Sequence, residues 1–225
     1  MNIKFNQHTL PARPVTVGES DHYPLTASNK IYIATINTRT LRTSESLLEL
    51  KEALKDIHWD IIGISEMRRA GEAIKEHSEY IIYNKRELGG QRGVGFMVKI
   101  HLKNYIQDFL GVTDRIAMLN MKILNFKKKW TIIQVYAPTE QANKSEYELF
   151  YSKLSQIIIT HSNNTIILIG DFNTQVGAKQ NEDEYVLGKF GHGKRSENGQ
   201  RLVDFLLEHN LTLLNSIFKK NENNK

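Results

Sequence analysis

Cysteine is absent from this 225-residue sequence, and proline is scarce, with four residues. The absence of cysteine excludes disulfide bonds, thiolate metal sites and a cysteine nucleophile, and it suits a nuclear or cytoplasmic protein better than a secreted one. No apolar run approaches the roughly 20 residues that a bilayer-spanning helix needs. Residues 1–10 also lack the apolar segment of a secretory signal peptide. We therefore expect a protein that is neither membrane-spanning nor secreted.

The composition is that of a folded chain with a modest excess of positive charge. Hydrophobic residues make up 40% of the sequence, charged residues make up 24%, and the formal net charge is +5. A chain of this length can bury a sizeable core, and these fractions argue against wholesale disorder. The positive charge favours a polyanionic partner, although many basic proteins bind none.

Three segments differ in character along the chain. Residues 1–29 hold three of the four prolines and show no apolar period, which predicts a flexible tail. Residues 30–218 carry the pattern of one domain, and residues 219–225 form a polar end that we expect to fray. Within the domain, the predicted strands are 31–36, 59–65, 80–83, 94–98, 115–124, 130–136, 165–169 and 211–214, and the predicted helices start at Ser44, 147 and 198.

The order of these elements and their apolar patterns predict the fold class. Strands outnumber helices and do not alternate strictly with them, which favours an α/β fold with two packed sheets and outer helices over a Rossmann fold. Ser44 is predicted to cap the first helix with its hydroxyl. Residues 115–124 alternate like a half-exposed antiparallel strand, whereas residues 165–169 have the apolar run of a fully buried strand.

Polar side chains end several of the predicted buried strands. Asn37, Glu66 and Tyr136 each end one strand, and Asp171 and Asn173 follow another. Because strand ends of one sheet can converge, these distant residues can build one site. Carboxylate and amide oxygens suit Mg²⁺ or Mn²⁺ and are poor ligands for zinc. A tyrosine hydroxyl and amide N–H groups can donate hydrogen bonds to a phosphate.

Each of these residues also has a structural interpretation when it is taken alone. Glu66 can be a solvated loop acid, Asn37 a turn former and Tyr136 an amphipathic residue at the edge of the core. The segment Gly170–Asn173 is the sharper signal, because a glycine and two polar groups directly follow an apolar strand. The prediction of a site therefore depends on the set rather than on any single member.

Five short motifs in order carry a family resemblance. They are Thr35-Ile36-Asn37, Gly63-Ile64-Ser65-Glu66, Gly93-Val94-Gly95-Phe96, Val135-Tyr136-Ala137-Pro138-Thr139 and Ile169-Gly170-Asp171-Phe172-Asn173. In this order they resemble the endonuclease/exonuclease/phosphatase superfamily. The segment Asn198–Phe205 and the tripeptide at 191–193 narrow the resemblance to the apurinic-type endonuclease domain of non-LTR retrotransposons and to host proteins of the craniofacial development protein 2 type.

The resemblance implies a fold and a set of roles. The fold would be a four-layer α-β-β-α sandwich of the exonuclease III and DNase I type. Glu66 would bind the catalytic Mg²⁺ with Asn37 beside it, Tyr136 and Asn173 would contact the scissile phosphate, and Asp171 would orient the attacking water. The implied reaction is hydrolysis of a DNA phosphodiester that leaves a 3′-hydroxyl.

One departure from the family pattern affects the expected activity. Family domains end with strands that supply an Asp-His pair, whereas Asp is followed directly by His only at Asp21-His22 in this sequence. We therefore expect a domain that lacks its last strands, with impaired nicking and an exposed sheet edge. A non-catalytic nucleic-acid-binding remnant and a phosphoesterase acting on small phosphorylated substrates are the alternatives. Lys194 and Arg195, beside loop glycines, are the predicted DNA contacts.

Overall fold

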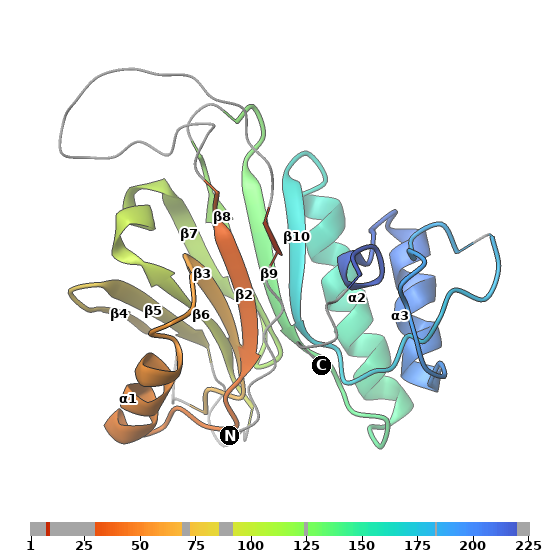
Figure 1. Ribbon diagram of the computed structural model, residues 1–225, viewed down its shortest axis with the longest axis horizontal. Helices are drawn as coiled ribbons and strands as arrows, with labels where there is room; N and C mark the ends of the chain where they lie inside the picture. Colours follow the sequence, from red (N-terminus) through yellow and green to blue (C-terminus); the bar gives the residue numbers. More distant parts are fainter. Residues whose placement is uncertain are drawn as a thin grey trace. The chain divides into compact units, whose positions relative to one another are not determined.

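The computed structural model describes residues 8–9, 30–68, 73–85, 92–123, 126–182 and 184–219 (Figure 1). Two compact units divide the chain. The first unit runs to Tyr136 and includes His161–Asp171, and the second holds Ala137–Thr160 and the described residues from Phe172 onward. Apart from two residues of a short strand, the predicted tail lies outside the described residues, as do residues 220–225.

The first unit contains two sheets. The first sheet has the order β1(His8–Thr9), β2(Tyr32–Asn37), β3(Ile61–Ser65), β6(Val94–Lys99), β5(Tyr80–Lys85) and β4(Ala73–Glu76). The second sheet has the order β10(Thr165–Asp171), β9(Trp130–Tyr136), β8(Ile116–Met121) and β7(Ile106–Gly111). Strands β2 and β3 are parallel, β10 and β9 are parallel, and the remaining pairs are antiparallel.

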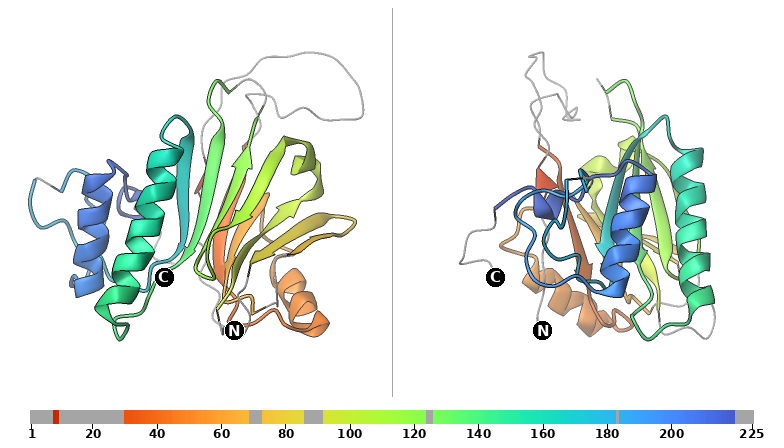
Figure 2. Two further views of the ribbon diagram at one scale, coloured as in Figure 1. Left: turned by 180° about the vertical axis from the view of Figure 1, so that it is seen from behind. Right: turned by 90° about the vertical axis from the view of Figure 1, so that its right-hand side faces the viewer.

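Alternation along the strands divides the apolar residues of the first unit between two core layers. One layer lies between the two sheets and joins residues such as Ile33, Ile61 and Phe96 of the first sheet to Leu119 and Ile132 of the second. The other lies on the opposite face of the first sheet, where helix α1(Ser44–Ala53) covers it (Figure 2). The packed sheets and the helix layer confirm the predicted α/β fold class.

Helices form most of the regular structure of the second unit. Helix α2(Lys144–Thr160) packs against α3(Glu197–Glu208) through the rings of Tyr151 and Phe205, whose centroids are 5.1 Å apart. Ser155 Oγ lies 2.7 Å from Nε2 of His209, which caps the carboxyl end of α3. A buried apolar cluster joins α3 to the segment around Val186 and Leu187. His209 therefore has a structural role at this helix end.

Several local predictions need correction. Thr43, not Ser44, caps α1: its side chain accepts from the Ser46 N–H, and the Ser46 side chain accepts from the Thr43 N–H, which satisfies two otherwise free donors. Strand β8 is buried on both faces rather than half-exposed. Its polar Asn120 tolerates burial because its amide donates to Asp108 Oδ1 and accepts from Thr131 Oγ1.

Two further predictions about the second half of the chain are wrong in detail. Strand β10 is mostly half-buried, because it lies at the edge of its sheet and pairs with β9 on one side. The strand predicted over 211–214 reduces to a single bridge between Leu187 and Leu213, followed by a short 3₁₀ helix, Leu214–Ser216. The structure also contains strands β4 and β7 and the 3₁₀ helix Ile100–Tyr105, which the sequence pattern did not predict.

Candidate functional site

Four of the predicted site residues lie at one end of the first unit. Asn37 ends β2, Glu66 directly follows β3, and Tyr136 and Asp171 end β9 and β10. The two parallel pairs bring these ends together in register, because Asn37 pairs with Ser65 and Asp171 pairs with Tyr136. The predicted convergence of distant strand ends therefore holds for all four residues.

The Asn37 side chain joins the two sheets at this end. Its Nδ2 donates to Glu66 Oε1 at 2.8 Å and to Asp171 Oδ2 at 3.2 Å. Its Oδ1 accepts from the backbone N–H of Arg39 at 3.0 Å. One carboxamide thus holds a carboxylate of the first sheet beside a carboxylate of the second.

The Glu66 carboxylate is stabilised in its charged form. Burial raises the pKa of the carboxyl, but hydrogen bonds outweigh this effect and hold the pKa below its ordinary value. The donors, in order of effect, are Asn37, Arg68 and Tyr136. Arg68 also forms an ion pair with Glu66, with Nη2 2.9 Å from Oε2. Glu66 is therefore ionised at neutral pH, as a cation ligand must be.

The Tyr136 hydroxyl is kept protonated by the same surroundings. Burial raises the pKa of the phenol, and the negative charges of Glu66 and Asp171 raise it further. Arg115 opposes this shift, and its guanidinium lies 5.4 Å from the centre of the Tyr136 ring. A protonated hydroxyl beside two carboxylates is a hydrogen-bond donor, as contact with a phosphate oxygen requires.

Strained backbone is concentrated around these residues. Arg39, Glu66 and Arg68 all have φ between 54° and 58°, in the left-handed region that non-glycine residues seldom occupy. Such conformations cost of the order of 1 kcal/mol each, and they persist where the surrounding structure fixes them, often at functional sites. Gly170, with φ of 140°, precedes Asp171, and an added Cβ there would lie 2.1 Å from the Val135 carbonyl oxygen.

The donor set fits a hard divalent cation. Within the described ranges, no cluster of three or more histidine, aspartate or glutamate side chains forms a metal site. Mg²⁺ needs fewer protein ligands, because it commonly takes one or two carboxylates and completes its shell with water and substrate phosphates. Glu66 can provide such a carboxylate. Asn37 meets the carboxylates through its nitrogen, so its predicted role as an oxygen ligand requires its amide to turn and stays a prediction.

Asn173 belongs to the second unit and is held within it. Its Nδ2 donates to the Ala137 carbonyl oxygen at 2.7 Å, and its φ is 47°. The buried Asn198 amide donates to the carbonyl oxygens of Pro138 and Asn173, each at 3.4 Å. Asn198, one of the residues that carried the family resemblance, thus supports the two segments that follow Tyr136 and Asp171.

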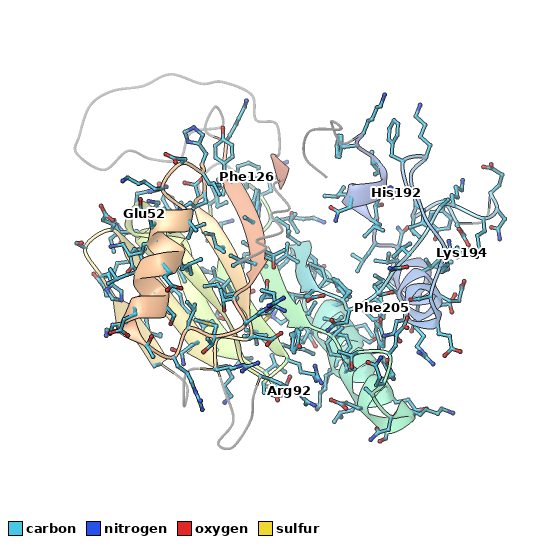
Figure 3. All side chains as sticks on the ribbon, turned by 60° about the horizontal axis from the view of Figure 1, so that its bottom comes forward. Glu52, Arg92, Phe126, His192, Lys194 and Phe205 are labelled. Atoms are coloured by element: carbon cyan, nitrogen blue, oxygen red, sulfur yellow. The ribbon has the colours of Figure 1, made fainter. Side chains whose placement is uncertain are left out.

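The two predicted DNA contacts in the second unit, Lys194 and Arg195, differ in their exposure to solvent. Lys194 is exposed on the loop that leads to α3, as is His192 of the same loop (Figure 3). The Arg195 side chain is only 4% exposed and forms a two-pronged ion pair with the Glu184 carboxylate, with N–O distances of 2.5 and 2.8 Å. Its Nε donates to the Val176 carbonyl oxygen at 2.8 Å. Arg195 therefore has a structural role, and Lys194 is the exposed cation of the pair.

This ion pair predicts how the second unit responds to acid. Hydrogen bonds from Arg195 are the largest effect on the Glu184 carboxyl and lower its pKa to about 2, below the value of about 4.3 expected in an unfolded chain. A lowered pKa adds stability that is complete above the unfolded value and is lost as the pH falls towards 2. We expect the urea concentration at which α3 is half unfolded to decrease as the pH is lowered from 4.5 to about 2. Hydrogen exchange of the α3 amides measures this midpoint. The Glu184→Gln variant should show a flatter profile, and equal slopes in both proteins would contradict the prediction.

Comparison with known proteins supports the family resemblance. A family model described as endonuclease-reverse transcriptase matches residues 130–223. Craniofacial development protein 2 of Tragulus javanicus is 30% identical over 211 residues, which cover 92% of this chain and 36% of that protein. The Bos taurus protein of the same name is 31% identical over 190 residues, covering 84% of this chain and 31% of the relative. The chain spans about a third of the length of these curated relatives.

These matches agree with the motifs at the strand ends. The chain is similar to the endonuclease/exonuclease/phosphatase superfamily. A solved structure, a 3′ phosphatase from Neisseria bound to a product DNA hairpin, has the same fold. It is 15% identical, with a TM-score of 0.51, and the match covers 79% of this chain and 70% of that one. The superfamily consists of nucleases and phosphoesterases, which supports the hydrolase class that the sequence predicts.

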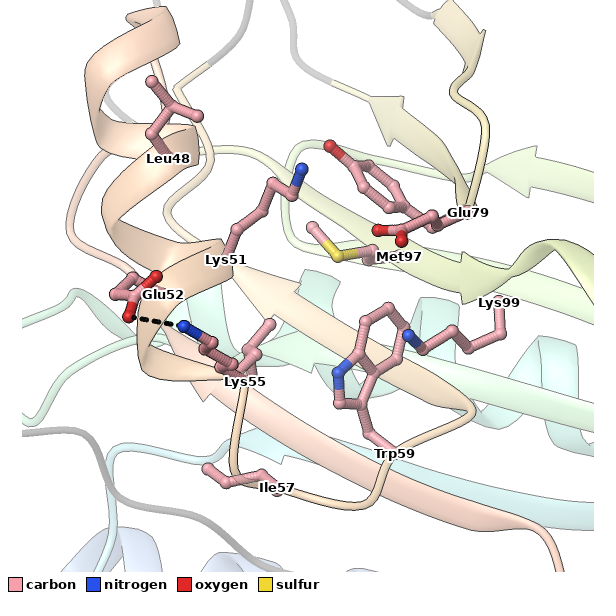
Figure 4. Close-up of a pocket in the computed structure, with 11 residues that line it drawn as sticks. Leu48, Lys51, Glu52, Lys55, Ile57, Trp59, Glu79, Met97 and Lys99 are labelled. Atoms are coloured by element: carbon pink, nitrogen blue, oxygen red, sulfur yellow. Dashed lines mark hydrogen bonds and ion pairs between the residues drawn. The ribbon is translucent and has the colours of Figure 1, made fainter.

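A separate hollow of about 400 Å³ lies over the outer face of the first sheet, beside α1 (Figure 4). Its lining is Leu48, Lys51, Glu52, Leu54, Lys55, Ile57, Trp59, Glu79, Tyr80, Met97 and Lys99. Trp59 precedes β3 whereas Glu66 follows it, so the hollow lies at the opposite end of that strand from Glu66 and the other site residues. The Lys99 ammonium group already lies over the Trp59 ring, 4.4 Å from its centre.

Several residues of the site could not be predicted from the sequence motifs. Arg68 and Arg115 carry no motif, and only the fold places them against Glu66 and Tyr136. Gln134 had a usable signal, because it is a polar residue in an otherwise apolar run and lies two positions before Tyr136.

No helix in the described parts of the chain is long and apolar enough to cross a membrane.

Proposed function

We propose that this chain is a Mg²⁺-dependent endonuclease domain of the retrotransposon type, which hydrolyses a phosphodiester bond in DNA. Mn²⁺ is the alternative ion, since it accepts the same oxygen ligands. The proposal rests on one observation above all. The Asn37 amide lies between the Glu66 and Asp171 carboxylates, and Tyr136 donates to Glu66 beside them.

Each residue of this group has chemistry suited to the proposed reaction. Glu66 is the proposed cation ligand, with Asn37 beside it. Asp171, whose carboxylate is held by the Asn37 amide, would orient the attacking water and accept its proton. The protonated Tyr136 hydroxyl would donate to a phosphate oxygen as charge builds there. A bound Mg²⁺ would supply polarisation of the phosphoryl oxygen and stabilisation of the leaving alkoxide.

Positive charge close to this group supports a polyanionic substrate. Arg39 and Arg42 lie on the loop after Asn37 and are exposed. That loop is fixed to the segment after β3, because Thr38 N–H donates to the Ser65 carbonyl and Leu41 N–H donates to the Met67 carbonyl. Exposed guanidinium groups beside a phosphate-cleaving site suit the backbone of a nucleic acid. Lys194 and Asn173, in the second unit, stay proposed phosphate contacts.

Replacing Glu66 by Gln should weaken Mg²⁺ binding by at least about tenfold, because the variant loses the charged oxygen ligand but keeps the shape of the side chain. Titration calorimetry of the wild-type chain and of Glu66→Gln with Mg²⁺ and Mn²⁺ measures this directly. Glu49→Gln, an exposed acid on α1, is the matched control and should bind like the wild type. Equal affinity in the wild type and Glu66→Gln would remove Glu66 as a ligand, and zinc-selective binding would contradict the oxygen-ligand argument.

Nicking of supercoiled plasmid tests the activity itself. Because the chain spans about a third of its relatives' length, the assay should compare it with a longer chain that carries a family-type Asp-His pair after residue 225. We expect nicking that requires Mg²⁺, is stronger in the longer chain and is lost in Glu66→Gln. Salt-dependent DNA binding without nicking by either chain would favour a non-catalytic binding domain. Hydrolysis of small phosphate esters without nicking would favour the phosphoesterase alternative.

A further inference from the structure

A layer of polar side chains lies directly beneath the four site residues of the first unit. Thr35 precedes Asn37 by two positions on β2, Ser65 directly precedes Glu66, and Gln134 precedes Tyr136 by two positions on β9. Because side chains alternate along a strand, Thr35 and Gln134 share faces with Asn37 and Tyr136 respectively. All three polar residues are buried, and Ser65 and Gln134 have no measurable exposure.

These side chains form hydrogen bonds from one sheet to the other. Gln134 Oε1 accepts from the Thr35 hydroxyl at 3.1 Å. Gln134 Nε2 donates to Ser65 Oγ at 2.8 Å and to the Val135 carbonyl oxygen at 3.3 Å. The Ser65 hydroxyl donates to the same Val135 oxygen at 3.3 Å. One buried carboxamide therefore connects β9 to both β2 and β3 and uses its acceptor and its donor to do so.

The backbone of the first sheet leaves room for this carboxamide. Gly63 pairs with Thr35 across β2 and β3, and a Cβ added at Gly63 would lie 1.9 Å from Gln134 Oε1. On the other sheet Ile169 pairs with Gln134, two positions before Asp171. Deeper between the sheets, the layer is apolar, with Ile33 and Ile61 facing Ile132 in one cluster. Among the described residues, this polar network thus lies between the site and the apolar layer.

Hydrogen bonds at this place have a consequence that apolar packing lacks. Apolar contacts tolerate small shifts between two sheets, whereas a buried carboxamide that leaves its partners costs free energy through unsatisfied polar groups. The sheet spacing at this end decides whether Asn37 of the first sheet can reach Asp171 of the second, at 3.2 Å. The network of Thr35, Ser65 and Gln134 restrains the two sheets in the layer next to that contact.

We propose that Gln134 is a positioning residue, which fixes the spacing of the two sheets beside the site so that Asn37 and Glu66 meet Tyr136 and Asp171. The proposal deepens the proposed function and rests on it wherever activity is the readout. Gln134 itself touches none of the reacting groups. A purely structural role would make its loss a loss of stability alone, so the experiment must separate stability from placement.

Three variants achieve that separation. Gln134→Met keeps the length of the side chain but removes the acceptor of the Thr35 hydroxyl and the donor to the Ser65 hydroxyl. A triple variant, with Thr35→Val, Ser65→Ala and Gln134→Met, removes the three polar side chains together, which can restore stability because neither hydroxyl is left facing a lost carboxamide. Thr131→Val is the matched control. Thr131 is a fully buried, hydrogen-bonded residue near the other end of the same strand, with Oγ1 2.7 Å from Asn120 Oδ1.

The first readout is the NMR signal of the Asn37 side-chain amide, which donates to two carboxylates in the wild type. We expect this signal to move to the position of a solvated amide in Gln134→Met and to stay there in the triple variant, although the melting temperature of the triple variant recovers. Thr131→Val should keep the wild-type signal. Recovery of both signal and melting temperature in the triple variant, or an unchanged signal in Gln134→Met, would overturn the proposal.

The second readout is nicking under the conditions that test the proposed function. A displaced catalytic group should lower kcat by on the order of 10²-fold, with little change in KM, in both Gln134→Met and the triple variant. A change confined to KM, or wild-type kcat in the triple variant, would overturn the proposal. If neither this chain nor the longer chain nicks DNA, the proposed function fails, and the Asn37 signal still decides whether Gln134 positions the site.

Discussion

Replacing Asp171 by Asn should lower Mg²⁺-dependent nicking by about 10²–10⁴-fold, the usual contribution of a positioned acid–base group. The substitution removes the negative charge but keeps an oxygen that can accept the Asn37 amide proton, so the sheet ends should stay together. Asn cannot accept a proton from water at neutral pH. The loss should therefore appear in kcat, while affinity for DNA stays near that of the wild type.

The matched control for this experiment is Asp108→Asn. Asp108 is an exposed aspartate on the edge strand β7, and it also accepts a hydrogen bond from an asparagine amide, Asn120 Nδ2, at 2.9 Å. Its substitution should leave nicking unchanged. The assay should use whichever of the two chain lengths nicks plasmid, under single-turnover conditions. Nicking by Asp171→Asn at the wild-type rate would show that Asp171 is not part of the reaction.

Strand ends were the part of the molecule that could be predicted well. The apolar runs that end at Asn37, Tyr136 and Asp171 are long enough to read as strands. Parallel pairing then places their carboxyl ends at one edge, and the structure has this pairing for β2 with β3 and for β9 with β10. Local pattern and global fold agree at this edge, which explains why distant residues could be assigned to one site.

Residues that depend on tertiary partners could not be predicted in this way. Arg195 was interpreted as a DNA contact because a basic residue beside loop glycines is usually solvated, yet Glu184, eleven positions earlier, covers its guanidinium. The alternation over residues 115–124 predicted a half-exposed strand, but Asp108 and Thr131 satisfy the polar Asn120 on a buried face. Residues 211–214 have the composition of a strand, but their strand pairing is a single bridge between Leu213 and Leu187. In each case the deciding contact is distant in sequence.

The Asn198–Phe205 segment shows that a family marker can be structural. Gly199 is required because an added Cβ would lie 2.0 Å from the Gln175 carbonyl oxygen. Asn198 accepts from Arg201 Nη1 at 2.7 Å, and the Arg201 guanidinium lies 4.6 Å from the centre of the Tyr147 ring. These residues connect α2, α3 and the loops before them. The segment identifies the family through its packing and gives no direct information on the substrate.

The second large effect is expected at Arg195, and it concerns the second unit alone. Arg195→Met should destabilise that unit by about 3–5 kcal/mol, because it leaves the buried Glu184 carboxylate without its counter-charge. It also removes the donor to the Val176 carbonyl oxygen. Hydrogen exchange of the α3 amides measures the effect locally, without requiring the two units to unfold together.

Two further variants separate the role of Arg195 in folding from contact with DNA. Arg195→Lys keeps the charge but loses the two-pronged pairing with Glu184, so it should still lower the protection of α3. Lys194→Ala should leave that protection within about 0.5 kcal/mol of the wild type. If Lys194 contacts a phosphate, its loss should also reduce the salt dependence of DNA binding by about one ion. A buried structural guanidinium cannot be removed without loosening the helix that it supports. If α3 keeps its wild-type protection from hydrogen exchange in Arg195→Met while DNA binding weakens, Arg195 is instead the nucleic-acid contact.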